Sequence, residues 1–178
     1  MAKSKKNVKK SFFEVRVPLS STKIVLYGES AESMIGRFVK LDLTRSLKGK
    51  SLEIKYKVGI DNNILVGEPV SLQLIGSYIR RMMRRGADYV EDSFVAECKD
   101  GKVSVKPFMI TRNKVSREIR KSLRDEARNH LISLCKTRNV MEMFSDITTN
   151  KVQRELSLRL KKIYPLALCE IRVFEKVK

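Results

Sequence analysis

Residues 116–136 of this chain are SREIRKSLRDEARNHLISLCK. Apolar residues recur in this stretch every three or four positions, at Ile119, Leu123, Ala127, Leu131 and Leu134. That spacing places them on one face of an α-helix, because a helix completes a turn in about 3.6 residues. Basic side chains occupy the opposite face. We therefore expect a helix that packs on a core with one side and presents positive charge with the other.

The residues before this helix follow a different period. Apolar residues at 52–58 alternate with Glu53, Lys55 and Lys57, which is the pattern of a half-buried β-strand. Similar short runs are found at 13–17, 38–43 and 64–66, and we expect residues 24–27 to form a buried run. A series of short strands separated by turn residues predicts an antiparallel sheet or a partial barrel over residues 12–67.

The rest of the chain mixes the two periods. Asp100-Gly101 is a hairpin signal, Asn150 and Gln153 resemble a capping box, and Pro165 disfavours helix before it. The predicted fold class is α+β, with the N-terminal antiparallel sheet or partial barrel followed by a helix, a β-hairpin, basic helices and a C-terminal strand. We expect the later elements in this order: a helix over 72–83, a hairpin of strands 89–98 and 103–110, a short helix at 140–144, a helix over 150–163, and a strand at 171–177.

The organisation of the chain is predicted from its local composition. Residues 1–11 contain five lysines and almost no apolar side chain, so we expect a flexible basic tail. Residues 12–178 are expected to form a single α+β domain, with two lobes at about 12–70 and 71–178 as the alternative.

The charge of the chain indicates the class of its partner. Thirty-eight Lys and Arg residues oppose twenty Asp and Glu residues, a formal net charge of +18 in 178 residues. A compact domain repels itself at that charge unless a polyanion neutralises it, and a nucleic-acid backbone does so. Apolar residues make up 42% of the chain, which is enough for a core and excludes a disordered basic protein.

The basic residues gather in four patches along the chain, with Arg37 beside a predicted strand. Four arginines at 80–85 exceed what the dipole at a helix C-terminus would explain, and guanidinium groups bind phosphate oxygens bidentately. Glu118 is within helical reach of Lys121 and Arg117 and can pair with one of them, but the surplus of basic residues at 112–138 is too large for internal pairing. The candidate RNA-binding residues are Lys5, Lys6, Lys9, Lys10, Arg37, Arg80, Arg81, Arg84, Arg85, Arg112, Lys114, Arg117, Arg120, Lys121, Arg124, Arg128, Arg154, Lys161 and Lys162.

No sequence motif indicates catalysis. The chain has no P-loop, GxGxxG, HExxH or GxSxG motif, so we expect no catalytic or cofactor-binding residues. Cys98, Cys135 and Cys169 are far apart and His130 is the single histidine, so we expect free thiols and no metal site. A nuclease subunit and a chromatin-type protein remain as alternatives. Aromatic residues are sparse in the basic segments, which favours recognition of RNA by shape and backbone over base stacking.

Membrane association is not expected from the sequence. No apolar stretch approaches the length of about 18 residues that a membrane-spanning helix needs. The N-terminus lacks the apolar core of a signal peptide, so a cytosolic location is expected. A helix lying on a membrane surface would need a bulky Trp or Phe face, which the basic helix lacks.

Three segments resemble a known family in their order and spacing. The first is IGRFVKLDL at 35–43, and the second is KPF at 106–108 followed by the basic run at 111–121. The third is IYPL at 163–166, followed by IRV at 171–173. Together they resemble the archaeal and eukaryotic S3Ae family of small-subunit ribosomal proteins.

The resemblance implies a non-enzymatic structural protein of the ribosome, in the cytoplasm. Members of this family bind rRNA on the small-subunit platform near the mRNA exit region and contact neighbouring ribosomal proteins. It therefore implies small-subunit rRNA and those proteins as partners, mRNA near the exit site as a further candidate, and a role in subunit assembly and translation. The chain ends at Lys178, directly after the last expected strand, so an archaeal-type member is expected.

Overall fold

A computed structural model describes residues 9–20, 22–47, 49–61 and 64–177 of the chain. Antiparallel strands, then helices and a final strand confirm the predicted α+β class. Its elements in chain order are β1 (Ser11–Val15), β2 (Ile24–Gly28), the 3-10 turn η1 (Glu32–Met34), β3 (Phe38–Asp42), β4 (Leu52–Asp61), β5 (Ile64–Leu74), α1 (Gly76–Met82), β6 (Tyr89–Glu91), β7 (Phe94–Cys98), β8 (Gly101–Thr111), α2 (Arg117–Thr137), α3 (Val140–Thr148), α4 (Lys151–Leu160) and β9 (Leu166–Lys176).

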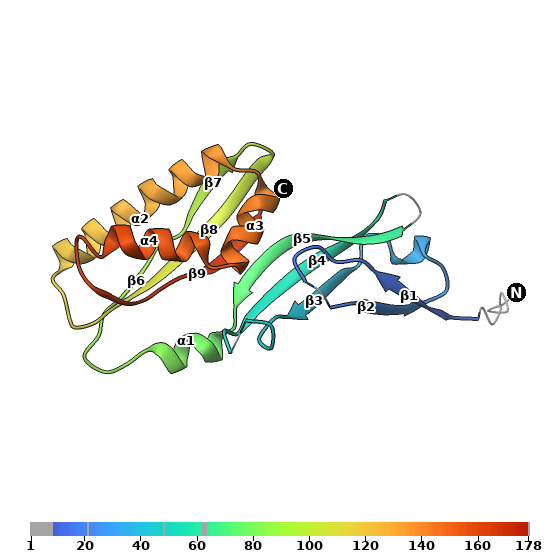
Figure 1. The fold of residues 1–178 in the computed structure, drawn as a ribbon, viewed down its shortest axis with the longest axis horizontal. Coiled ribbons are helices and arrows are strands. Elements are labelled where there is room, and N and C mark those ends of the chain that lie inside the picture. The colour runs from blue at the N-terminus through green and yellow to red at the C-terminus, as the bar shows by residue number, and fades with distance from the viewer. Residues whose placement is uncertain (1–8, 21, 48, 62–63, 178) are drawn as a thin grey trace, which may run out of the picture.

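One antiparallel sheet runs through most of the molecule. Its strand order is β3-β4-β5-β9-β8-β6, and β7 also pairs with β8. The strand β5 pairs with β4 along its length but with β9 only at Ser71–Gln73, so this short segment joins the two parts of the sheet. A separate ribbon of β1 and β2 lies against the β3–β5 end (Figure 1), where the backbone N–H of Arg16 donates a hydrogen bond of 2.8 Å to the carbonyl of Leu65.

The helices cover one face of the other end of the sheet. Figure 1 shows α2 and α4 side by side over β7, β8 and β9, with α3 between them and β5. The predicted apolar face of α2 is confirmed, because Leu123, Ala127 and Leu131 are fully buried there. Phe144 of α3 meets Phe174 of β9 edge to face, with ring centroids 4.9 Å apart. These contacts form the core that fixes the orientation of α2.

The expected helix over 72–83 is wrong at its N-terminal end. Leu72 lies in β5, and the helix α1 begins only at Gly76. Leu72 pairs with Ile54 on one side and with Phe174 on the other. Hydrogen bonding to two neighbouring strands therefore outweighs the helical spacing of the apolar residues.

Other boundaries also differ from the expectation. The run at 24–27 is a strand but is not buried, since Val25 and Tyr27 are 53% and 55% exposed on the outer face of the β1–β2 ribbon. The expected strand 89–98 is divided into β6 and β7, the short helix at 140–144 continues to Thr148, and the last strand begins at Leu166. Of the predicted tail, residues 1–8 lie outside the described residues.

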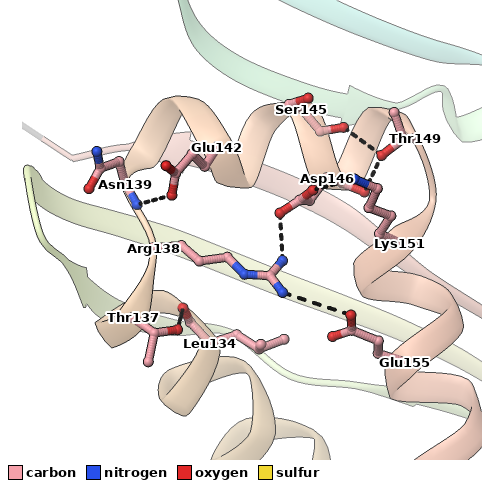
Figure 2. Close-up of polar contacts among 10 residues, drawn as sticks. All are labelled: Leu134, Thr137, Arg138, Asn139, Glu142, Ser145, Asp146, Thr149, Lys151 and Glu155. Carbon is pink, nitrogen blue, oxygen red and sulfur yellow. Dashed lines mark hydrogen bonds and ion pairs between the residues drawn. The ribbon is translucent and has the colours of Figure 1, made fainter.

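The predicted capping box of Asn150 is wrong. Asn150 adopts a left-handed backbone conformation with φ of 61°, and its side-chain oxygen accepts a hydrogen bond of 2.6 Å from Lys50 Nζ. Gln153 instead donates to the carbonyl of Ile147 at 2.9 Å. The capping box of this region lies at the start of α3, where Glu142 accepts a hydrogen bond of 3.1 Å from the backbone of Asn139 (Figure 2).

Candidate nucleic-acid interface

The arginine block at 80–85 lies at the end of α1 and in the turn that follows it. Arg80 and Arg81 occupy the last turn of the helix, and all four arginines are exposed. Arg81 is directed toward the body of the protein, since its Nη2 lies 3.4 Å from Ser51 Oγ and its guanidinium lies over the Tyr78 ring. Arg84 and Arg85 follow the helix and line a cavity.

That cavity unites two of the predicted basic patches. It has a volume of about 460 Å³, and Arg84, Arg85 and Arg112 contribute its charge. Met82, Ile110 and Leu168 are among the apolar residues that line it. Its described lining contains no carboxylate, so the cavity is cationic with an apolar base. This composition suits a phosphate group with part of a sugar or base attached to it.

Asp88 and Thr111 position this cavity, although neither belongs to a motif or a charged run that would mark it in the sequence. The backbone N–H of Thr111 donates to Asp88 O at 2.9 Å, and the Thr111 hydroxyl contacts the same carbonyl at 3.0 Å. The Asp88 carboxylate accepts a hydrogen bond of 3.0 Å from the backbone of Val115. Arg112 N donates to Pro165 O at 3.3 Å. The bonds to Asp88 hold the segment between β8 and α2 against the end of the turn that carries Arg84 and Arg85. The bond to Pro165 holds it against the link between α4 and β9.

A second cationic cavity lies along the N-terminal half of α2. Its volume is about 320 Å³, and its lining residues are Tyr89, Arg117, Arg120, Lys121 and Arg124. Tyr89 comes two residues after Ala87 of the first cavity, so the two cavities follow one another along the chain. We call the basic residues of both the cationic edge: Arg84, Arg85, Arg112, Arg117, Arg120, Lys121 and Arg124.

Arg128 differs from the other candidates on α2. Its Nε and Nη2 donate to the two carboxylate oxygens of Asp92 at 2.9 and 3.0 Å, and its guanidinium lies over the ring of Phe94. The carboxylate comes from the short link between β6 and β7. Arg128 therefore already holds an anionic partner within the chain.

Two further cations are also paired, Arg138 directly after α2 and Arg159 on α4. Arg138 Nη1 donates to Asp146 at 2.5 Å, and its Nη2 lies 3.8 Å from Glu155, so it joins α3 to α4 (Figure 2). Arg159 Nε donates to Glu126 at 2.6 Å. We call Arg128, Arg138 and Arg159 the paired end.

The remaining predicted residues lie outside the cationic edge. Lys114 is exposed in the segment between β8 and α2, and Arg154, Lys161 and Lys162 are exposed on α4 and just after it. Arg37 and the lysines at 9 and 10 are exposed around the β1–β3 end, which Figure 1 shows at the opposite end of the molecule from α2. Lys5 and Lys6 lie outside the described residues.

The described residues lack the geometry of a metal site, a reactive thiol or a membrane-spanning helix. Among them, no group of three His, Cys, Asp or Glu side chains is arranged to hold a metal ion. His130 is half-buried in α2 with its Nδ1 unpaired, and burial and Arg159 lower its pKa. Burial raises the pKa of the Cys135 and Cys169 thiols to about 12, which keeps both groups protonated and unreactive. No helix in the described part of the chain is long and apolar enough to span a membrane.

Comparison with known proteins gives one family. The model of the Ribosomal S3Ae family matches residues 2–178. A relative from Nanoarchaeum equitans, named small ribosomal subunit protein eS1, is 28% identical over 93% of this chain and 88% of its own length. A protein of the same name from Methanothermobacter thermautotrophicus is 33% identical over 69% of this chain and 67% of its own length. Another from Desulfurococcus amylolyticus is 25% identical over 91% of this chain and 80% of its own length.

Proposed function

This chain belongs to the Ribosomal S3Ae family, and we propose that it binds the rRNA of the small ribosomal subunit through the cationic edge. The family assigns it a structural role in the ribosome, in agreement with the expectation that it is not an enzyme. The observation that carries the proposal is the pair of adjacent cavities whose described linings hold seven basic residues and no acid.

The physical basis of the proposal is charge that the protein leaves without a partner. A guanidinium group that has no internal carboxylate is available to a phosphate, and each neutralised phosphate releases counterions. The cavities join the α1–β6 turn, the β8–α2 segment and α2, so they would follow a backbone that passes across this edge. Lys114, Arg154, Lys161 and Lys162 extend the positive surface beyond it.

We propose a finer location from the family as well. In this proposal the protein lies on the platform of the small subunit near the mRNA exit region, within the cytoplasmic ribosome, and supports subunit assembly and translation. Neighbouring ribosomal proteins are further partners, and mRNA near the exit site is a candidate. The exposed Phe12 and Tyr27, whose ring centroids are 4.9 Å apart on the β1–β2 ribbon, support a protein contact there.

The test is the salt dependence of binding to small-subunit rRNA. If about ten basic side chains contact phosphates, log K should fall with log salt with a slope of about −7 to −9. The triple variant Arg84→Ala, Arg85→Ala and Arg112→Ala should make that slope shallower by about 2 to 3. A matched control removes the same charge at the other end of α2, through Lys99→Ala, Lys102→Ala and Lys136→Ala.

The outcomes separate this proposal from its competitors. A steep slope that only the edge variant reduces supports the cationic edge. An equal effect of the two triple variants would show that binding depends on net charge and not on this edge. A wild-type slope shallower than about −3 would contradict binding through many phosphates. Equal competition by duplex DNA would favour the chromatin-type alternative.

A further inference from the structure

Tyr89 is an exposed aromatic ring with a rigid support. It is the first residue of β6, and 55% of its surface is exposed. One side of its ring faces Phe108 of β8, with ring centroids 6.5 Å apart and an angle of 27° between the planes. Phe108 is fully buried. Because Phe108 is fixed in the core, it holds the orientation of the tyrosine ring above it.

The outer face of this ring is open. The cation–π contacts of the described residues involve Phe38, Tyr78 and Phe94, but not Tyr89. The cavity of about 320 Å³ next to the ring is within the range of volumes, about 300 to 1,000 Å³, that small-molecule sites occupy. A flat group of the size of a nucleobase can therefore stack on the ring of Tyr89 and fit into the cavity beside it.

The cations around the ring are available to a phosphate. The ion pairs of the described residues include none of Arg117, Arg120 and Lys121. The Nε of Arg120 is buried and has no hydrogen-bond partner among the described residues. Arg124 forms a fixed wall, because its Nε donates to the carbonyl of Glu91 at 3.2 Å.

We propose that Tyr89 stacks with an unpaired RNA base while Arg117, Arg120 and Lys121 bind the phosphates next to that base. This site deepens the proposed rRNA-binding function and rests on it. Base–aromatic stacking is tolerant of sequence because each base has a flat face, and unpaired bases in loops and bulges are the ones free to stack. An acidic peptide would use the cations but would leave the ring without a flat partner.

The absence of tryptophan from the chain makes a direct test possible. The variant Tyr89→Trp places a single tryptophan at the site, and Tyr27→Trp places one at a ring of equal exposure, 55%, on the β1–β2 ribbon. An RNA hairpin with an unpaired loop should quench the fluorescence of Trp at position 89, and a blunt duplex of the same length should not. Neither RNA should quench Trp at position 27.

Affinity measurements complete the test. Tyr89→Ala should weaken binding of the loop RNA by about tenfold, within the roughly 5- to 150-fold range of base–aromatic stacking, and should leave duplex binding and the salt slope unchanged. Tyr89→Phe should stay within about twofold of the wild type, because it keeps the ring. Tyr89→Leu keeps an apolar side chain on Phe108 but should behave like Tyr89→Ala, which separates stacking from packing. Tyr27→Ala is the matched control.

Two results would overturn the inference in different ways. If loop RNA binds with a steep salt slope but Tyr89→Ala and Tyr89→Leu bind it as the wild type does, the stacking site is wrong and the cationic edge stands. If the wild-type protein binds neither RNA, the proposed function fails and the stacking site fails with it. Equal weakening of loop and duplex binding would also contradict stacking.

Discussion

The basic residues toward the two ends of helix α2 have different surroundings. At the N-terminal half, Arg117, Arg120 and Lys121 line an open cavity with no described acid in its lining. Toward the C-terminal end, Arg128 and Arg138 are bonded to carboxylates from the β6–β7 link and from α3. The fold brings carboxylates to Arg128 and Arg138. It brings none of the described carboxylates into the cavity that Arg117, Arg120 and Lys121 line.

This difference teaches where the excess charge of the protein can act. A cation with an internal carboxylate contributes mainly to the position of its helix, whereas a cation without one attracts a polyanion at every distance within the screening length. The net charge of +18 is therefore not spread evenly over the surface. Less of the positive charge is available to a polyanion at the paired end than at the cationic edge.

The largest effect is expected where a cation is paired in the interior. Lys50 Nζ lies 2.6 Å from Glu170, and the two side chains are 9% and 11% exposed. Glu170→Ala would leave the ammonium group buried without its carboxylate, which should lower the free energy of unfolding by about 3–5 kcal/mol. Chemical denaturation measures this loss.

A double variant controls for the loss of packing. Replacing both partners with apolar residues, Lys50→Met and Glu170→Leu, removes both buried charges, and its stability should lie much closer to that of the wild type. Equal losses in the single and double variants would show that the charge pair is not what stabilises this junction between β4, α4 and β9.

The next largest effect is expected at the paired end. Arg138→Ala removes the contacts to Asp146 and Glu155 that join α2, α3 and α4 (Figure 2). We expect a loss of about 1–3 kcal/mol in the free energy of unfolding, because charged hydrogen bonds in a half-buried site are lost. The exposed Lys136 nearby gives the control, and Lys136→Ala should change stability by less than about 0.5 kcal/mol. Similar values for both variants would remove the distinction between paired and open cations.

The sequence predicts periodic features of this molecule well and long-range ones poorly. The apolar face of α2 with Leu123 and Leu131 is confirmed, and so is the hairpin that Asp100-Gly101 predicts, although its turn is formed by Lys99 and Asp100. Each depends on residues close together in the chain. The helical spacing around Leu72 predicts the wrong element, because its strand is specified by Ile54 and Phe174, which are distant in sequence.

The same limit applies to the candidate interface. Basic residues can be listed from the sequence, but only the fold shows that Arg112 joins Arg84 and that Asp92 neutralises Arg128. Tyr89 is not predicted as a site residue, because it lies outside the basic segments of the sequence. It lies on a neighbouring strand, and only the packing of α2 beside β6 brings it to the cations.

A paired comparison on α2 itself tests binding directly. Arg117→Ala with Lys121→Ala should make the salt slope of rRNA binding shallower by about 1.5, since two phosphate contacts are lost, with a change in stability below about 0.5 kcal/mol. Arg128→Ala should leave the slope nearly unchanged, because that guanidinium already binds Asp92. A reduced slope for Arg128→Ala equal to one lost contact would show that the carboxylate gives way to RNA.

The smallest effect is expected at His130, which faces the paired end. Burial is the main cause of its lowered pKa, followed by Arg159, whereas Glu155 and Glu126 act in the opposite direction. The unfolded histidine takes up a proton near pH 6.5, and the folded one does so only at lower pH. The unfolded state therefore binds more protons in this window, and stability should fall as the pH drops from about 7.5 to 5.5.

His130→Gln isolates this contribution, because the chain has a single histidine. The free energy of unfolding of the variant should fall less between pH 7.5 and 5.5 than that of the wild type, and the difference between the two curves should vanish above the pKa of the unfolded histidine. If the wild type and the variant lose stability in parallel, His130 accepts its proton equally well in both states. The effects of burial and Arg159 on the pKa of His130 would then be balanced by those of Glu155 and Glu126.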